Sequence, residues 1–378
     1  MTRAATPGLL AVAAREVTWM RRDPAFLFLL IGVPLIVFGL LAATFSTGVI
    51  RDLRIDIVDV DRSTASARFV QTIDAAPGVL VDRRSPDLGA AMRAIRAGET
   101  IAAVYLPANL ERDILAGRRP QVVVLYNRQF FTPGNVAASA VQGSVAAAAA
   151  ELPRARDAGG SDSLVVERYV LANPGFNYAQ FLLRAILPTV LHVVVAVGAA
   201  AAVGSEFHAR RGVGGWLAAA GGRPLTALLG KLAPYFAIFV CQMAIASALL
   251  HGLLYVPFRG DPVILGAAAV LFLAAYLAVG ALLVLLVRSL AAGLALVGIV
   301  CSPAFGFAGV GFPILAMGDF AKGWGALLPL RWYIQILVDQ AARGVPPRLS
   351  LPPFLALAGL ASGQPAVAKK TVDQVAGA

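Results

Sequence analysis

The sequence is poor in charge, in cysteine and in histidine. Only 14% of its 378 residues are Asp, Glu, Lys or Arg, while 58% are hydrophobic and the mean hydropathy is +0.76. This balance excludes a water-soluble protein of ordinary composition, so the lipid bilayer must surround much of the chain. The two cysteines, Cys241 and Cys301, lie in apolar runs, which argues against a disulfide framework. The three histidines are spaced too widely for a metal site.

Acidic residues are also scarce. There are 21 of them against 32 Lys and Arg, which gives a formal net charge of +11 and a pI of about 10.2. In a soluble protein such an excess of positive charge would indicate nucleic-acid binding. Here the basic residues flank apolar runs, where they set membrane topology and contact anionic lipid head groups. We therefore expect membrane lipid as a partner and no nucleic acid.

Motifs for nucleotide hydrolysis and for other catalysis are missing. A phosphate-binding loop requires G-x-x-x-x-G-K-[ST], but Gly230-Lys231 is followed by Leu232 and is preceded by Leu225 where the first glycine would stand. Nucleophile-elbow, H-E-x-x-H and paired C-x-x-C patterns are absent as well. We therefore expect neither enzyme activity nor a bound cofactor. Transport against a gradient would need a separate motor subunit.

The sequence does contain a series of apolar runs long enough to cross a membrane. A hydrocarbon core of about 30 Å takes about 20 helical residues. Residues 1–24 predict an amphipathic helix on the membrane surface, and residues 25–46 predict the first span. Residues 178–362 contain the predicted second to sixth spans, at about 181–203, 232–256, 263–287, 290–317 and 351–360. The last run is shorter than a bilayer requires and leads into a polar C-terminal tail, residues 363–378.

Residues 51–177 differ in character, because charges are frequent and no apolar stretch approaches the length of a span. Strand patterns at 55–60, 101–106 and 121–126 alternate with helix patterns at 63–73, 87–97, 109–116 and 135–152. This order predicts an α/β domain. The predicted fold class is an α-helical polytopic membrane protein with about six spans and an inserted extracytoplasmic α/β domain. Asp56, Asp59 and Asp61 suggest either a cation site or carboxylates that face solvent.

The distribution of positive charge predicts the orientation. Arg15, Arg21 and Arg22 precede the first span, which places the N-terminus in the cytoplasm and makes an uncleaved span a better interpretation than a cleaved signal peptide. The later basic clusters fall on the same side, and the inserted domain then faces outward. The prediction is a multi-pass protein of the inner (plasma) membrane. The later basic residues are Arg210, Arg211, Arg223, Lys231, Arg288, Lys369 and Lys370.

The loop after the second predicted span holds the first candidate site. Glu206 lies where the span meets the cytoplasm, and His208, Arg210, Arg211 and Trp216 follow it. One interpretation is a docking element for a cytoplasmic partner, in which Glu206 pairs with an arginine. The alternative is an ordinary basic loop with an interfacial tryptophan. Both remain open on composition alone.

A second candidate region follows the fifth predicted span. Residues 306–332 are interrupted by Pro313 and several glycines, which predicts short helices that re-enter the membrane in place of one continuous span. Asp319 and Lys322 either pair within this re-entrant region or lie exposed in a loop. Arg184, near the start of the second span, is expected to extend toward the outer head groups.

Several segments resemble the permease subunits of ABC type 2 exporters, in the branch with a large extracytoplasmic domain between the first two spans. The resemblance covers nearly the whole chain. It rests on the order and spacing of several segments, because no single segment is specific to the family. They are Met20-Arg21-Arg22-Asp23-Pro24, Tyr126-Asn127-Arg128-Gln129-Phe130-Phe131-Thr132-Pro133-Gly134-Asn135, Phe176-Asn177-Tyr178, Gly204-Ser205-Glu206, Leu229-Gly230-Lys231-Leu232-Ala233-Pro234-Tyr235 and Leu328-Pro329-Leu330-Arg331-Trp332-Tyr333.

This resemblance implies a coupling helix at about residues 206–216 and ATP hydrolysis in a partner ABC ATPase subunit. It also implies a homodimer or a paired permease, with a periplasmic adaptor as a further partner, and export of an amphipathic, drug-like or lipid-like substrate. The family's usual loop is similar to Arg-Glu-x-Glu-x-Gly-Thr. Here residues 205–213 read SEFHARRGV, which keeps Glu206 and Gly212 and lacks the second Glu and the Thr.

Two other classes of function compete with transport by an ABC system. The first is a membrane-anchored sensor or assembly factor whose outer domain binds a ligand. The second is a secondary transporter, which is disfavoured because the spans contain few acidic residues for ion coupling.

Overall fold

A computed structural model describes residues 7–46, 51–118, 120–126, 131–151, 177, 179–207 and 212–376. The chain divides into two compact units, of which the first contains Met1–Ser46 and Ala179–Ala378 and the second contains Thr47–Tyr178. We call them the membrane unit and the inserted unit. Each is described below by itself.

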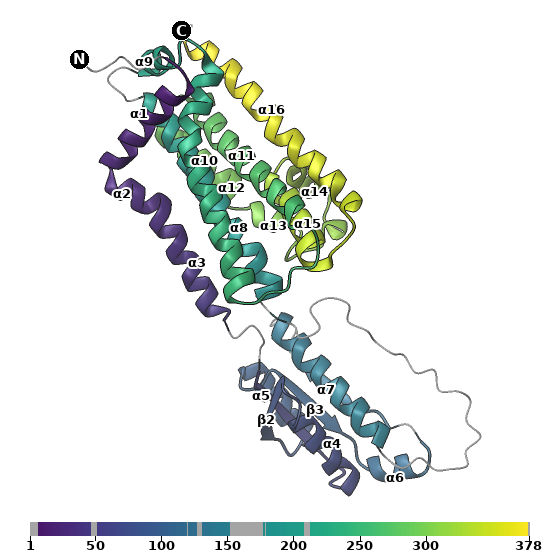
Figure 1. Cartoon of the computed structure of the whole chain (residues 1–378). Coiled ribbons are helices and arrows are strands. Elements are labelled where there is room, and N and C mark those ends of the chain that lie inside the picture. Colours follow the sequence, from purple (N-terminus) through teal and green to yellow (C-terminus); the bar gives the residue numbers. More distant parts are fainter. Residues whose placement is uncertain are drawn as a thin grey trace. The chain divides into compact units, whose positions relative to one another are not determined.

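The membrane unit contains five helical segments, within the described residues, that are long and apolar enough to cross a bilayer (Figure 1). They are Pro24–Thr44, Ala179–Phe207, Pro224–Leu253, Pro262–Val287 and Leu290–Phe307. In detail these segments are α2 (Pro24–Leu27), η1 (Phe28–Gly32) and α3 (Val33–Thr44); η2 (Ala179–Leu183), α8 (Arg184–Gly204) and η3 (Ser205–Phe207); α10 (Pro224–Ala248) and η4 (Leu249–Leu253); α11 (Pro262–Val287); and α12 (Leu290–Cys301) and α13 (Ala304–Phe307).

The starts of these helices follow from local chemistry. Asp23 accepts a hydrogen bond from the backbone N–H of Phe26 and Pro24 takes the first helical position, where its missing N–H costs nothing. Asp261 and Pro262 play the same two roles for α11. Pro34, Pro188 and Pro234 lie inside span helices, as membrane helices permit.

The centre of the membrane unit is the contact between α8 and α11, which both bury most of their inward-facing side chains. A Cβ placed on Gly280 of α11 would lie 2.1 Å from the carbonyl oxygen of Ala196 in α8. The two backbones therefore approach as closely as small residues allow, which is how membrane helices gain packing energy in the absence of a hydrophobic driving force.

Replacing Gly280 with Ala should destabilise the protein by about 1–3 kcal/mol, the usual cost of overpacking. The matched control is Gly266→Ala in the same helix, where an added Cβ meets nothing within 4 Å. Thermal unfolding of both variants in detergent, followed by tryptophan fluorescence, checks this. Equal melting temperatures for the two variants would contradict the close contact.

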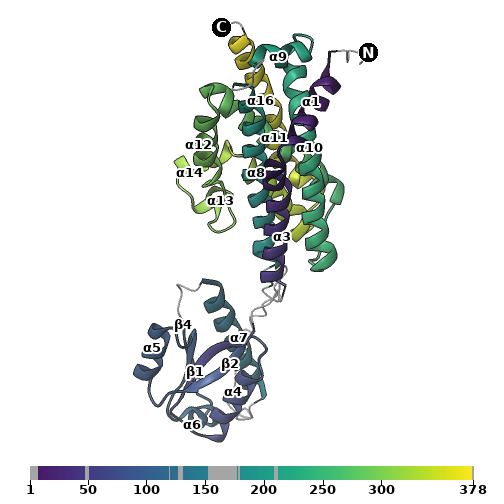
Figure 2. The ribbon, with the colours of Figure 1, turned by 90° about the vertical axis from the view of Figure 1, so that its left-hand side faces the viewer.

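Three further elements lie at one end of the membrane unit, which we call the α1 end. They are α1 (Leu9–Arg22), α9 (Gly212–Ala219) and the last turns of α16 (Leu351–Ala376), which contact one another through α9 (Figures 1 and 2). The helix predicted within residues 1–24 is present as α1, with a buried stripe of Val12, Glu16 and Met20, and its place on a membrane surface stays a prediction. Leu9 and Leu10 are exposed, which the apolar pattern alone did not predict.

The last helix differs from the sequence prediction. The apolar run was expected to end near residue 360 and to lead into a polar tail, whereas α16 continues as one helix of 26 residues, Leu351–Ala376. At about 1.5 Å per residue it rises about 39 Å, more than a hydrocarbon core. It packs along α11 and α15, and those contacts extend the helix past Gly363. Whether it crosses the bilayer stays a prediction, because it is not among the five apolar segments.

The region after α13 is broken into short helices, in agreement with the pattern that predicted re-entry. They are η5 (Ile314–Ala316), α14 (Asp319–Ala326), α15 (Pro329–Leu337), η6 (Val338–Arg343) and η7 (Pro347–Ser350). Their placement in a membrane stays a prediction. Of the two alternatives for Asp319 and Lys322, the structure does not show the pairing: Asp319 is exposed, and no ion pair between them occurs among the described residues. Pro313 lies exposed just before η5, in extended conformation.

The inserted unit is an α/β fold with a four-stranded sheet in the order β2-β1-β3-β4 (Figure 2). β1 (Leu53–Asp59) pairs in parallel with β2 (Val79–Arg84) and β3 (Ala102–Leu106), and β4 (Val123–Tyr126) is antiparallel to β3. The core on one sheet face includes side chains of α4 (Thr64–Asp74), α6 (Leu110–Leu115) and α7 (Phe131–Glu151). α5 (Leu88–Ala97) packs on the other face, through Ala91 against Val58 and Ala103.

The predicted strands and helices of residues 51–151 are present, with β2 as an additional strand. That strand was missed because it is an edge strand whose last three residues, Asp82, Arg83 and Arg84, are exposed and break the apolar alternation.

The three aspartates do not form a cation site. Asp56 is buried and accepts hydrogen bonds from the N–H and the hydroxyl of Ser85, Asp59 accepts from Arg62 and Ser66, and Asp61 accepts from Glu111.

Candidate functional site

The first turns of α10 are held against α1. Gly230 permits this, because a Cβ there would lie 2.7 Å from the carbonyl oxygen of Leu9 and 2.8 Å from Cβ of Val12. The next residue, Lys231, then projects toward α1, and one turn later Tyr235 does the same. The stretch Gly230-Lys231-Leu232-Ala233-Pro234-Tyr235, noted in the sequence for its resemblance, is thus the contact surface of α10 for α1.

Four charged side chains and one hydroxyl meet at this contact, and we call them the charge network: Arg15, Glu16, Glu206, Lys231 and Tyr235. Lys231 Nζ lies 2.6 Å from Glu16 Oε2 and 2.7 Å from Glu206 Oε1. Arg15 donates to both oxygens of Glu206, at 3.0 and 2.8 Å. Tyr235 donates to Glu16 Oε1 at 2.8 Å. The network joins α1, η3 and α10, and its two positive and two negative charges balance.

Because the network is buried, the loss of any one of its charges is costly. The side chains of Glu16, Glu206 and Lys231 are 3–4% exposed, whereas Arg15 is 39% exposed and reaches solvent. A buried charge without a partner is costly, so each of the three depends on the others. A hollow of about 340 Å³ adjoins the network, lined by Arg15, Glu16, Trp19, Ser205, Glu206, Lys231 and Leu290.

Helix α9 is fastened to the same place by two contacts. Trp216 is 1% exposed, donates from Nε1 to the carbonyl oxygen of Ala227 at 3.1 Å, and its ring lies 5.9 Å from Lys231 Nζ, within reach of a cation–π interaction. At the other end of α9, the N–H of Gly8 donates to Ala219 at 3.0 Å. Helix α9 is therefore hydrogen-bonded both to α10 and to Gly8, directly before α1.

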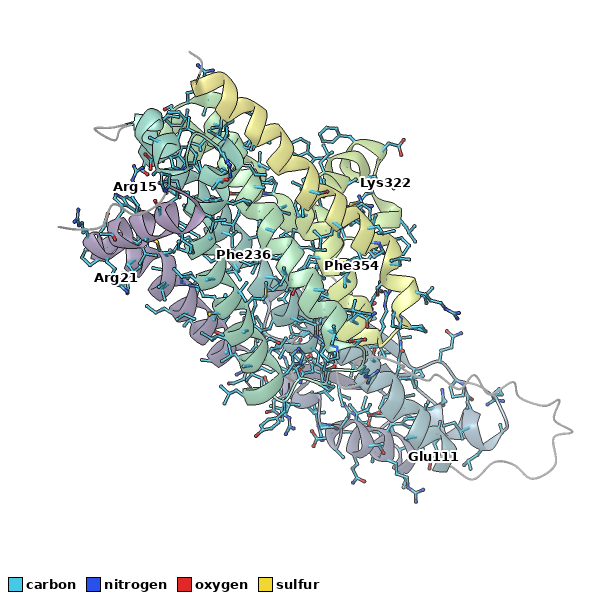
Figure 3. All side chains as sticks on the ribbon, turned by 45° about the horizontal axis from the view of Figure 1, so that its top comes forward. Arg15, Arg21, Glu111, Phe236, Lys322 and Phe354 are labelled. Atoms are coloured by element: carbon cyan, nitrogen blue, oxygen red, sulfur yellow. The ribbon has the colours of Figure 1, made fainter. Side chains whose placement is uncertain are left out.

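Of the predicted coupling residues, the structure brings Glu206 and Trp216 to the charge network. His208, Arg210 and Arg211 lie outside the described residues. Glu206 pairs with Arg15 and Lys231 of this chain, which ties η3 to α1 and α10. Pro313, Asp319 and Lys322 are not part of the site: Lys322 lies on another side of the membrane unit from Arg15 (Figure 3), and its carbonyl accepts from Arg331 at 2.6 Å.

Sequence reasoning missed four members of the network, namely Arg15, Glu16, Lys231 and Tyr235. In an amphipathic helix on the membrane surface, charged residues such as Arg15 and Glu16 are expected to face water. One signal was present: Glu16 falls four residues after Val12 and four before Met20, which puts a carboxylate within an apolar stripe.

Within the described part of the chain, no group of three or more His, Cys, Asp or Glu residues lies close enough together to hold a metal. The ion pairs of the site join α1, η3 and α10 in one arrangement.

A family model described as "ABC-2 family transporter protein" matches residues 24–362. The chain is a member of the ABC-2 transporter family. Searches against curated proteins and against solved structures gave no significant match. The family assignment confirms the resemblance noted in the sequence. This ABC-2 permease is thus a multi-pass membrane subunit of an ABC transporter, and its five apolar helices agree with that role.

The charge network predicts strong coupling between Glu16 and Lys231. Lys231→Met leaves two buried carboxylates with Arg15 alone, and should cost about 3–5 kcal/mol of stability. Adding Glu16→Gln restores charge balance, so the double variant should be more stable than the sum of the single effects by about 1–3 kcal/mol. Thermal unfolding of the four proteins in detergent measures this cycle.

Additive effects would show that the two groups do not interact. Arg343→Met serves as the control, because Arg343 pairs with Asp339 at 3.2 Å with its side chain 63% exposed. Exposed pairs contribute about 0–1 kcal/mol.

Proposed function

We propose that this ABC-2 permease is the transmembrane subunit of an ATP-driven exporter, and that α9 receives the movement of a partner ATPase. The observation that carries the proposal is the charge network, which joins α1, η3 and α10 through ion pairs, together with the hydrogen bond from Trp216 that holds α9 to α10. The exported substrate is amphipathic, drug-like or lipid-like, and the working assembly is a homodimer or a paired permease with two ATPase subunits.

In this proposal α9 is the coupling helix. Its inner face is fixed by Trp216, while Gly214 and Ala218 on its other side are exposed and small, so that a partner surface can approach the backbone. ATP binding in the partner would move α9, and the network would carry that movement to α1 and α10. Alternation between two states requires contacts that differ in the two states, and the ion pairs of the network supply them.

The charge distribution supports a cytoplasmic α1 end. Lys and Arg are more numerous there than at the opposite end, where α10 ends and α11 begins, and the positive-inside rule then orients the protein. The described basic residues at the α1 end are Arg21, Arg22, Arg223, Arg288, Lys369 and Lys370, and Arg210 and Arg211 precede α9 in the sequence. The opposite end has Arg184, Arg259, Arg343 and Arg348. The inserted unit is then extracytoplasmic.

Replacing Glu206 with Ala should uncouple transport from ATP hydrolysis, because Arg15 loses its partner and Lys231 keeps only Glu16. We expect a loss of substrate-stimulated ATPase activity of about tenfold, within the range of a coupling free energy of about 1–3 kcal/mol. The measurement uses the complex of permease and ATPase reconstituted in liposomes. Asp319→Ala is the matched control, since it also removes one carboxylate from the membrane unit. Wild-type coupling in Glu206→Ala would remove Glu206 from the mechanism.

The proposed orientation is tested by thiol labelling in intact cells. In a background with Cys241→Ala and Cys301→Ala, a cysteine at Arg96 in the exposed part of α5 should react with a membrane-impermeant maleimide. A cysteine at Gly214 in α9 should react only after the membrane is opened. Labelling of both in intact cells, or of neither, would contradict the topology.

Co-purification separates an exporter from a membrane-anchored sensor. The full chain, extracted in mild detergent from its own host, should bring down an ABC ATPase in stoichiometric amount. A protein that only anchors a ligand-binding domain would come down without one.

A further inference from the structure

A cavity of about 440 Å³ lies at the end of the membrane unit opposite α1, within the size range of sites for small ligands. It is lined by the start of α8, by the last turns of α10 together with η4, by the start of α11, and by α15. Apolar side chains dominate its lining, among them Leu187, Val240, Leu265 and Leu273. The charge network, at the α1 end, shares no lining residue with it.

One positive charge lines this apolar cavity. Arg184 is 4% exposed, and its guanidinium donates to the carbonyl oxygen of Pro257 at 3.0 Å. Its Nε atom is buried and has no hydrogen-bond partner. Among the described residues, no acidic side chain forms a salt bridge with Arg184. Arg184 is thus buried within the protein, and its expected contact with outer head groups stays a prediction.

This arrangement is costly unless something completes it. A buried cation without an anion carries a desolvation penalty of several kcal/mol, and among the described residues the charge that acts on Arg184 is the like charge of Arg259. The other polar side chains of the lining are already engaged or uncharged: His251 binds the carbonyl oxygen of Val256 at 2.7 Å, and Tyr333 donates to the sulfur of Met243. The missing component is an anion.

The backbone around the cavity is also unusual. Three π-helical turns border it: η2 ends directly before Arg184, η4 carries His251, and η6 begins directly after Leu337. Such turns are rare in helices and occur often at functional sites, because they redirect side chains and free backbone groups.

We propose that this cavity binds an acidic amphiphile. The phosphate or carboxylate of its head group pairs with Arg184, and its hydrocarbon chain lies against the apolar side chains of α10 and α11. The shared chemistry is an anion attached to an acyl chain, which a membrane phospholipid and a free fatty acid both offer. Binding does not require ATP or a partner subunit, so the site stands or fails independently of the exporter function proposed above.

Equilibrium binding to the full-length protein, held in nanodiscs of phosphatidylcholine, tests this site. The probes are labelled phosphatidylglycerol and oleate, each paired with a neutral counterpart, labelled phosphatidylcholine and oleyl alcohol. At least one acidic probe should bind about tenfold or more tightly than its neutral counterpart, as expected for one charge-assisted hydrogen-bonded pair. Which acidic probe binds identifies the source of the anion. Inorganic phosphate at millimolar concentration should not displace it, because phosphate lacks the chain.

Two pairs of variants locate the binding. Arg184→Gln should weaken acidic binding about tenfold or more, whereas Arg348→Gln, which removes an exposed charge, should not change it. Gly266→Leu should fill the cavity and block binding, because Gly266 lines it and an added Cβ meets nothing within 4 Å. Gly298→Leu is its control, a helical glycine with equally open surroundings outside the cavity.

Equal binding of acidic and neutral probes would overturn the proposal, as would displacement by phosphate alone. Unchanged affinity in both Arg184→Gln and Gly266→Leu would overturn it too. If Arg184→Gln fails to elute as a folded protein, the comparison of acidic with neutral probes on the wild-type protein and the effect of Gly266→Leu still decide the question.

Discussion

The arrangement of the α1 end depends on one buried ammonium group. Lys231 contacts carboxylates from two other parts of the chain, Glu16 in α1 and Glu206 in η3, which directly follows α8. A single buried charge without its partner is strongly destabilising. The ion pairs therefore hold the helices together mainly because separating the charges costs free energy, and less because forming the pairs gains it. A network of this kind favours one arrangement of helices over others, and it opens only when an external force supplies the energy.

The position of the network within the chain explains why it can transmit movement. Membrane helices pack through small residues and have little hydrophobic preference for one register over another. Gly280 brings α11 close to α8, and Gly230 brings α10 close to α1. At the contact of α10 with α1, directional ion pairs also define how the two helices are aligned. The close-packed α8–α11 contact then serves as the fixed part of the unit, and α1, α9 and α10 as the part whose position is set by charge.

The spans were predictable because the length and apolar composition of each span can be read from its own residues alone. Residues 263–287 were predicted and α11 is Pro262–Val287, since an apolar run bounded by Asp-Pro and Arg carries its own start and end. The first helix shows what such local signals miss. A charged residue such as Glu16 is expected on the polar face of α1, and only the structure shows that Lys231, 215 residues away in the sequence, lies against it. The same holds for Arg184, whose burial follows from the packing of α10, α11 and α15 around it. The length of α16 was missed for a related reason, because tertiary contacts extend it beyond its apolar run.

The two polar features of the membrane unit share α10, and this has a mechanical consequence. Lys231 and Tyr235 lie in the first turns of α10 and belong to the charge network, while Val240, Met243 and Ser247 lie further along it and line the cavity. A helix transmits rotation and tilt along its axis through its backbone hydrogen bonds, although Pro234 removes one of these within α10 and the π-helical turn of η4 at its end permits local adjustment. In the two proposals taken together, a shift of α10 that breaks the Lys231 pairs would also move one wall of the cavity past Arg184. Occupation of the cavity and the state of the network would then be coupled through α10, and by linkage that coupling would act equally in both directions.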